Sequence, residues 1–241
     1  MRTTNIHHGL LLTLAASLAG AGHADAVAPE SYKLTVGSYR YADGGTGIDR
    51  NLRWQSGDTH AWIGDYRDAA FGAQSRVGFD TSITLGPALQ LQPSLQAATH
   101  GFVGASANLL LGDPWYAIAG WGRTNLRPYF NLNFDPNDAL TLGAGWRGAA
   151  EQSVQLYCIA DDRLHSGQKD WHLLLRQPLD PQRHLTLDLL RKTGDGDAGP
   201  VRAWGLAATL DYPGWFVRLA RDPKQNFSAL DATRLSFGLR F

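Results

Sequence analysis

Segments of about ten residues in which apolar and polar side chains alternate recur along this chain, and they restrict its fold more than any other feature. In the segment 89–97, Leu89, Leu91 and Leu95 share one parity, whereas Gln90 and Gln92 fall on the other. The segments 76–85, 125–135 and 203–212 repeat the pattern. Because successive side chains of a strand point to opposite faces, each segment is predicted to be a β-strand with one apolar and one polar face.

The length of these segments and the positions of the aromatic residues favour a transmembrane barrel. A tilted strand of about ten residues is long enough to cross the hydrocarbon of a bilayer. Tyr and Trp near strand ends are typical of the two membrane interfaces. The aromatic residues near the ends of the expected strands are Tyr32, Tyr41, Trp115, Tyr116, Trp146, Trp171, Tyr212 and Trp215. A soluble periplasmic β-sandwich or lipid-binding barrel, which would also alternate, is the weaker alternative.

The first segment of the sequence has the features of a secretory signal peptide. Arg2 is followed by a short apolar run over 10–18 and by the cleavage pattern Ala24-Asp25-Ala26. We therefore expect residues 1–26 to be a signal peptide and residues 27–241 to form a single β-barrel domain. No later run of about 18 apolar residues occurs, so the sequence contains no candidate transmembrane helix.

The segment 233–241 alternates again and ends in an aromatic residue. Leu235, Phe237, Leu239 and Phe241 share one face of the expected strand. This ending resembles that of Gram-negative outer-membrane β-barrel proteins, whose last strand closes the barrel and whose final aromatic residue is read by the assembly machinery. The resemblance implies an all-β, antiparallel up-and-down barrel in the cell outer membrane, with outer-membrane lipids and the barrel-assembly machinery as partners.

The number of strands is predicted from the turns between alternating segments. A single-chain bacterial barrel has an even number of strands joined by short turns and modest loops, so one of the fifteen candidates must be wrong. Turns and loops counted from the two ends of the sequence disagree between residues 139 and 168, where we place the error. We predict about 12 strands, within a range of 12 to 14. The candidate strands lie near 31–41, 49–56, 59–67, 74–85, 88–99, 103–111, 115–123, 126–135, 139–147, 152–161, 169–177, 183–192, 201–212, 214–222 and 232–241.

The polar faces of these strands are predicted to line the lumen of the barrel. They could form a polar conduit or ligand site, or a network of ion pairs and hydrogen bonds that fills the interior. The run from Asn125 to Asp135 is the segment where we first expect contact with a small polar solute or polymer. The lumen-facing candidates for substrate contact are Arg76, Asp80, Gln92, Arg127, Tyr129, Asn131, Asn133, Asp135, Arg147 and Arg176.

Composition excludes several other classes of function. The formal net charge is zero at pH 7, so the sequence lacks the basic footprint of a nucleic-acid-binding protein. The single cysteine, Cys158, excludes an internal disulfide and a cysteine-rich metal site. We expect no metal site and no cofactor.

A non-enzymatic channel, transport-associated or structural barrel is therefore the preferred hypothesis, and a lipid-modifying enzyme of the acyl hydrolase or transferase type is the alternative. Acyl transfer requires a nucleophile within hydrogen-bond reach of a base. The His-x-Ser pattern of outer-membrane phospholipases does not occur at any histidine of the predicted mature chain. We therefore predict no catalytic residue, and the enzymatic alternative would place His100 or His165 in its site.

Overall fold

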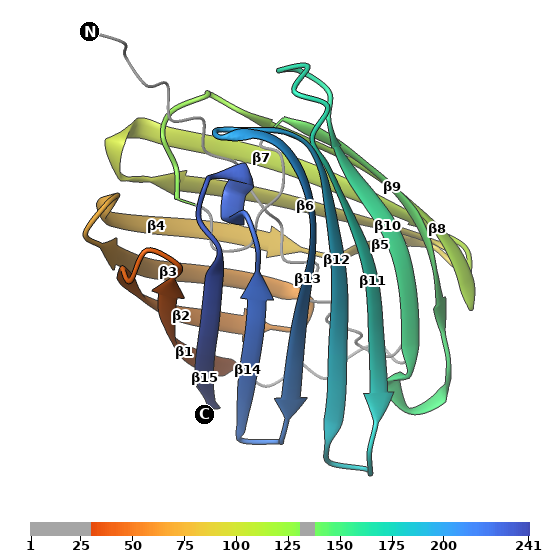
Figure 1. Cartoon of the computed structure of the whole chain (residues 1–241). Helices are drawn as coiled ribbons and strands as arrows, with labels where there is room; N and C mark the ends of the chain where they lie inside the picture. The colour runs from red at the N-terminus through yellow and green to blue at the C-terminus, as the bar shows by residue number, and fades with distance from the viewer. Residues whose placement is uncertain (1–29, 131–137) are drawn as a thin grey trace, which may run out of the picture.

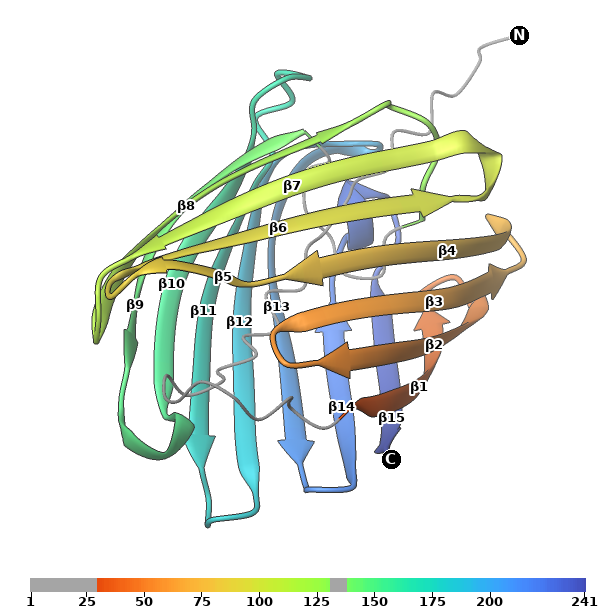
Figure 2. The same ribbon diagram turned by 180° about the vertical axis from the view of Figure 1, so that it is seen from behind.

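The computed structural model describes residues 30–130 and 138–241, which form one antiparallel β-sheet closed on itself (Figures 1 and 2). Three short 3₁₀ segments, η1 (Thr99–Gly101), η2 (Ala149–Glu151) and η3 (Gln225–Phe227), lie in its connections. None of the helical segments in these residues has the length and apolar character needed to cross a membrane. The strands are β1 (Ser31–Tyr41), β2 (Thr46–Ser56), β3 (Thr59–Asp68), β4 (Gly72–Thr81), β5 (Ile83–Gly86), β6 (Leu89–Ala98), β7 (Phe102–Leu111), β8 (Trp115–Thr124), β9 (Ala139–Arg147), β10 (Ser153–Asp161), β11 (Lys169–Pro178), β12 (His184–Gly196), β13 (Gly199–Asp211), β14 (Trp215–Asp222) and β15 (Ala232–Arg240).

Pairing of the first and last strands closes the sheet into an up-and-down barrel. Lys33 on β1 lies opposite Arg240 on β15, and the antiparallel ladder continues to Tyr41 opposite Ala232. β4 and β5 both pair with β6, on either side of an interruption at Ser82, so together they form one strand of the barrel. In the described part of the chain the barrel therefore has 14 strands, and the preferred number of 12 is wrong.

Among the predicted strands, the structure contradicts 126–135, of which it describes residues 126–130. Residues 125–130 form no strand, and Leu126 takes a positive φ of 58°, which ends the extended backbone after Thr124. The adjacent residues Tyr129 and Phe130 are both buried, whereas neighbours on a strand would face opposite sides. The error in the strand count thus lies here and not between 139 and 168, because β9 and β10 are both strands.

The two ends of the barrel differ in their connections. The end where β1 begins and β15 ends, called the terminal end below, has turns such as 57–58 and 112–114. The opposite end, called the loop end, includes the longer connections 125–138, 162–168 and 223–231. This arrangement is the one that an even number of antiparallel strands produces.

The outer surface of the barrel is apolar. Leu142 is 65% exposed and Leu95 is 59% exposed, although both belong to the centre of strands. Leucine, valine, isoleucine and phenylalanine side chains of one parity cover the outside of β1, β3, β4, β9, β10, β14 and β15 in the same way. A soluble protein would bury these faces against a second layer, so the soluble alternative is wrong and the surface suits lipid chains.

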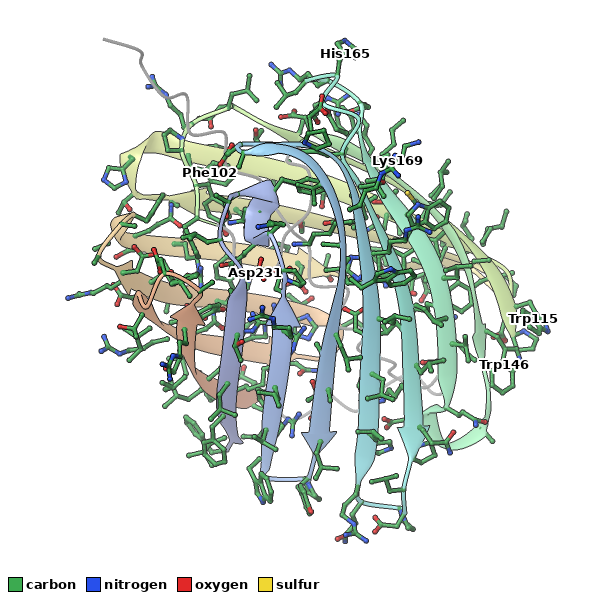
Figure 3. All side chains as sticks on the ribbon, viewed as in Figure 1. Phe102, Trp115, Trp146, His165, Lys169 and Asp231 are labelled. Carbon is green, nitrogen blue, oxygen red and sulfur yellow. The ribbon has the colours of Figure 1, made fainter. Side chains whose placement is uncertain are left out.

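Aromatic side chains gather on the outside near the terminal end. Tyr32 stacks on Phe241 with 5.9 Å between ring centroids, and the rings of Trp115 and Trp146 lie 6.3 Å apart (Figure 3). The expectation of an interfacial position was wrong for Tyr41 and Tyr116, whose exposed fractions are 8% and 3%. Their parity directs both side chains into the barrel.

Glycines make room for the large side chains that point inward. Gly78 lies opposite Trp62 on β3, and a Cβ atom at this glycine would come within 2.2 Å of the indole ring. On β9, a Cβ atom at Gly145 would come within 2.4 Å of the Tyr116 ring. These approaches are closer than carbon atoms tolerate, so the interior depends on the missing side chains.

Candidate functional site: a polar cavity inside the barrel

The interior contains a cavity of about 830 Å³ lined mainly by polar side chains. It reaches the turns of the terminal end at Pro181 and Pro213, and toward the loop end it reaches Gln225 in η3. Residues of β1–β4, β6 and β10–β15 contribute to its wall. We call this part of the interior the open lobe.

Another part of the interior does not border this cavity. Among the described residues, none from β7, β8 or β9 lines it. Some of the inward side chains of these strands pack into an apolar cluster with two residues of β10, beside the buried polar residues Ser106, Asn108 and Thr141. We call this cluster the apolar lobe; it consists of Leu110, Tyr116, Ile118, Ala139, Tyr157 and Ile159.

The described part of the connection 125–138 folds into the barrel near the loop end. The Tyr129 ring stacks on Phe102 with 4.1 Å between centroids, and its hydroxyl donates a hydrogen bond to Gln96 Oε1 at 3.0 Å. The Phe130 ring stacks on Tyr66 at 3.9 Å. Burial raises the pKa of Tyr129 to about 12. Aromatic packing therefore fixes this segment to the inner wall.

A second segment narrows the barrel at the loop end. η3 lies beside the ends of β14 and β15 (Figure 1), and its Phe227 is 1% exposed against Val201. Lys192 is fully buried nearby and donates a hydrogen bond to Asp222 Oδ1 at 2.5 Å. Gln225 of η3 and Asp222 at the end of β14 thus border the cavity on the loop-end side.

Ion pairs neutralise many of the charges around the cavity. Arg76 on β4 donates a short hydrogen bond to the buried carboxylate of Asp49 on β2. Asp80 lies 2.7 Å from His60 Nδ1 and 3.5 Å from Arg53. These pairs cross the wall formed by β2, β3 and β4.

A second set of ion pairs lies near the terminal end. Asp211 Oδ1 accepts a hydrogen bond from Arg240 at 2.5 Å, and its other oxygen lies 3.7 Å from Arg176. Arg176 also donates to Glu151 at 2.8 Å. Asp211 therefore serves two cations. The cavity lining contains eight Lys and Arg residues and six Asp and Glu residues, so its formal charge is positive.

The structure places the ten predicted lumen residues in four different settings. Arg76, Asp80 and Arg176 line the cavity from strands, and Tyr129 lines it from the connection after β8. Gln92 and Arg147 belong to the inward parity of β6 and β9 and lie outside the cavity lining. Arg127 is exposed. The predicted residues that lie outside the described part of the chain are Asn131, Asn133 and Asp135.

Most cavity residues were not among the ten predicted ones, and three charged examples lie on the first two strands. Lys33 on β1 and both Asp49 and Arg53 on β2 line the cavity. Their parity was a usable signal, because Thr35 and Asn51 on the same strand faces are polar and also line the cavity. The alternation of β1 and β2 is weak, however, since Arg40 and Arg50 on the outer face are polar too.

The two histidines named in the enzymatic alternative lie in different connections at the loop end. His100 is exposed in η1, and His165 is exposed in the connection between β10 and β11 (Figure 3). The Ser166 hydroxyl donates a hydrogen bond to Asp161 Oδ2 at 2.7 Å. Neither histidine lines the cavity, so the geometry gives the enzymatic alternative no support.

Comparison with solved structures finds outer-membrane barrels. The outer membrane protein Omp33 of Acinetobacter baumannii has a TM-score of 0.54 and 8% sequence identity over 88% of this chain and 98% of that chain. The NanC porin has a TM-score of 0.49 and 9% identity over 86% and 98% of the two chains. An outer-membrane channel from Pseudomonas putida F1 has a TM-score of 0.48 and 13% identity over 89% and 96%. No protein-family model and no curated protein sequence matches the chain. The likeness to Omp33 shows a shared fold.

Proposed function

We propose that this chain, which has the fold of Gram-negative outer-membrane β-barrels, is an outer-membrane channel that conducts small polar solutes through its open lobe. The cavity of about 830 Å³ carries the proposal, because it extends between the turns of the terminal end and the region of η3. A barrel of 14 strands is wider than one whose interior side chains can fill completely. A structural barrel without transport would need no such space.

The orientation in the membrane follows from the connections. In bacterial outer-membrane barrels the short turns face the periplasm and the longer loops face outward. We therefore assign the terminal end to the periplasmic side and the loop end to the cell exterior. On this assignment solutes enter past Tyr129 and η3 and leave between the turns that contain Pro181 and Pro213.

Planar lipid bilayers test the channel directly. The purified, folded barrel is expected to give discrete conductance steps. Thr209 lines the cavity, so Thr209→Trp should reduce the conductance of each step. Thr193 lies on the outer parity of β12, so Thr193→Trp introduces the same bulk outside the lumen and should leave conductance unchanged.

Three outcomes would overturn the proposal. They are the absence of conductance from inserted and folded barrels, equal conductance of Thr209→Trp and wild type, and turnover of phospholipid by the purified protein without any conductance. Folding of each variant is checked by gel electrophoresis, in which a folded barrel migrates as a compact species before heating and not after it. A variant that fails to fold is thereby distinguished from a folded barrel that does not conduct.

A further inference from the structure

Basic side chains are concentrated on one side of the open lobe. β14, β15, β1 and β2 are consecutive neighbours in the barrel, and each directs at least one cation into the cavity. Lys33 lies at the centre of this group, since its Cα partners are Arg240 on β15 and Arg53 on β2. We call this surface the basic wall; its members are Lys33, Arg53, Arg218, Arg234 and Arg240.

Acidic groups compensate this wall only in part. Arg53 and Arg240 each face one carboxylate, but Asp80 also serves His60, and Asp211 also serves Arg176. The two acids that pair with the basic wall are therefore shared with other bases. Asp188 attracts Arg218, and Asp49 and Asp222 attract Arg234, without forming an ion pair with either arginine.

Two cations of the basic wall form no ion pair among the described residues. Lys33 makes no hydrogen bond or ion pair there, and its Nζ atom lies 5.7 Å from the centroid of the Phe216 ring. Arg218 makes no ion pair, and its buried Nε atom has no hydrogen-bond acceptor. A guanidinium without an acceptor is unfavourable in a protein interior. The Arg218 guanidinium can therefore donate a hydrogen bond to an anionic group that does not belong to the chain.

We propose that the basic wall binds anionic solutes through their phosphate or carboxylate groups and makes the channel selective for anions. Arginine presents several N–H donors in a planar fork that fits both oxyanions, and Lys33 adds a point charge. This inference rests on the proposed channel and names the class of solute that it conducts. A solute passing the terminal-end half of the cavity exchanges its hydration shell for the donors of Arg218, Arg240 and Lys33.

The selectivity of single channels tests the inference. In a gradient of potassium chloride, the reversal potential of the wild-type channel should indicate a higher permeability for chloride than for potassium. Lys33→Gln and Arg218→Gln should each lower the permeability ratio of chloride to potassium by about two- to fivefold, because each removes a unit charge from the conduit. The effect should shrink at 1 M salt, where the screening length falls to about 3 Å.

Arg202→Gln is the matched control for these variants. Arg202 is exposed on the outer parity of β13 and lies outside the cavity lining, so the same chemical change should leave the permeability ratio unaltered. Conducting channels whose ratio is equal in wild type, Lys33→Gln and Arg218→Gln would overturn the inference and leave the channel proposal intact.

A binding measurement separates the anion site from conduction. Inorganic phosphate, citrate and neutral sucrose are titrated calorimetrically into the folded barrel in detergent. The anion site is supported if phosphate or citrate releases binding heat with the wild type and not with the double variant Lys33→Gln/Arg218→Gln. The anion that binds with the higher affinity shows whether the site prefers phosphate or carboxylate groups. Binding without conductance would reject the channel alone. Equal binding of sucrose and the anions, or no binding together with no conductance, would reject the anion site.

Discussion

The open lobe and the apolar lobe are built from the same kind of strand but contain different interiors. In β7–β9 and the loop-end half of β10, inward residues such as Leu110, Ile118 and Ile159 pack together and do not line the cavity. In β11–β15 and β1–β2 the inward positions hold small, hydroxyl-bearing or charged residues such as Thr209 and Ser236. Alternation thus decides which side chains face inward, whereas their size and polarity decide whether the interior is filled.

The two lobes have different physical roles within one barrel: the apolar lobe stabilises the fold, and the open lobe holds charges that are accessible to water. Apolar packing inside β7–β10 stabilises one side in the manner of a soluble core, with dispersion contacts and water excluded. Charges on the opposite side remain accessible to water in the cavity and need partners or counterions. Variants that act on one lobe alone therefore measure how independent the two roles are.

The largest effect is expected from Tyr116→Ala in the apolar lobe. Tyr116 is 3% exposed, and the Arg147 guanidinium lies 4.2 Å from its ring centroid. Loss of a buried aromatic side chain should lower the free energy of unfolding by about 3–5 kcal/mol. Denaturant unfolding from lipid vesicles measures this change, and the lipid-facing Leu142→Ala is a control with a smaller cost.

Conductance shows whether this loss stays within the apolar lobe. Tyr116 does not line the cavity, so the folded Tyr116→Ala barrel should conduct like the wild type. A larger single-channel conductance in Tyr116→Ala than in wild type would mean that the two lobes form one lumen.

A slightly smaller effect is expected from Arg76→Met in the open lobe. Arg76 is 5% exposed and pairs with Asp49, which is 8% exposed. Removal of the guanidinium leaves a buried carboxylate without its main partner, which should cost about 3 kcal/mol of unfolding free energy. Arg76→Met/Asp49→Leu should recover most of this loss, and denaturant unfolding of both variants checks it. A single variant as stable as wild type would show that water in the cavity already solvates Asp49.

Fourteen of the fifteen candidate strands are strands in the structure, because lipid and cavity water impose opposite polarity on the two faces of each strand. The described part of the predicted strand 126–135, residues 126–130, is not a strand, since alternation is a property of residue order and does not reveal whether the backbone has a hydrogen-bonding neighbour. Tyr129 and Phe130 find partners on β3, β6 and β7 that are distant in sequence. The preferred number of 12 failed because turns as short as 57–58 fit more strands into the chain than we expected.

Part of the candidate site could be predicted in the same way. Arg76, Asp80 and Arg176 were identified by parity and line the cavity. The division into lobes was not predicted, because parity assigns a side chain to the interior without showing how the interior side chains pack. Lys33 lies at the centre of the basic wall because β1 pairs with both β15 and β2.

Two glycine substitutions compare the lobes at smaller cost. A Cβ atom at Gly78 would meet the Trp62 ring at 2.2 Å, and one at Gly145 would meet the Tyr116 ring at 2.4 Å. Each alanine variant should lose about 1–3 kcal/mol through overpacking. Only Gly78→Ala should also change conductance, since Trp62 lines the cavity and must move.

Gly214→Ala is the control for both, because a Cβ atom there meets no atom within 4 Å. It should alter neither unfolding nor conductance. A conductance change in Gly145→Ala equal to that in Gly78→Ala would contradict the separation of the lobes.

The smallest effect is expected from Tyr129→Phe, at the boundary between the lobes. The variant loses the hydrogen bond to Gln96, which should cost about 1 kcal/mol of unfolding free energy at pH 7. Because burial raises the pKa of Tyr129 to about 12, above that of an unfolded tyrosine, the neutral hydroxyl stabilises the folded barrel fully below about pH 10 and loses this contribution as the pH rises through 12. The free energy of unfolding should therefore change more between pH 8 and pH 11 for the wild type than for Tyr129→Phe. Equal pH dependence of the two proteins would mean that the Tyr129 hydroxyl is solvated by the cavity, and that the open lobe extends behind the aromatic packing of this connection.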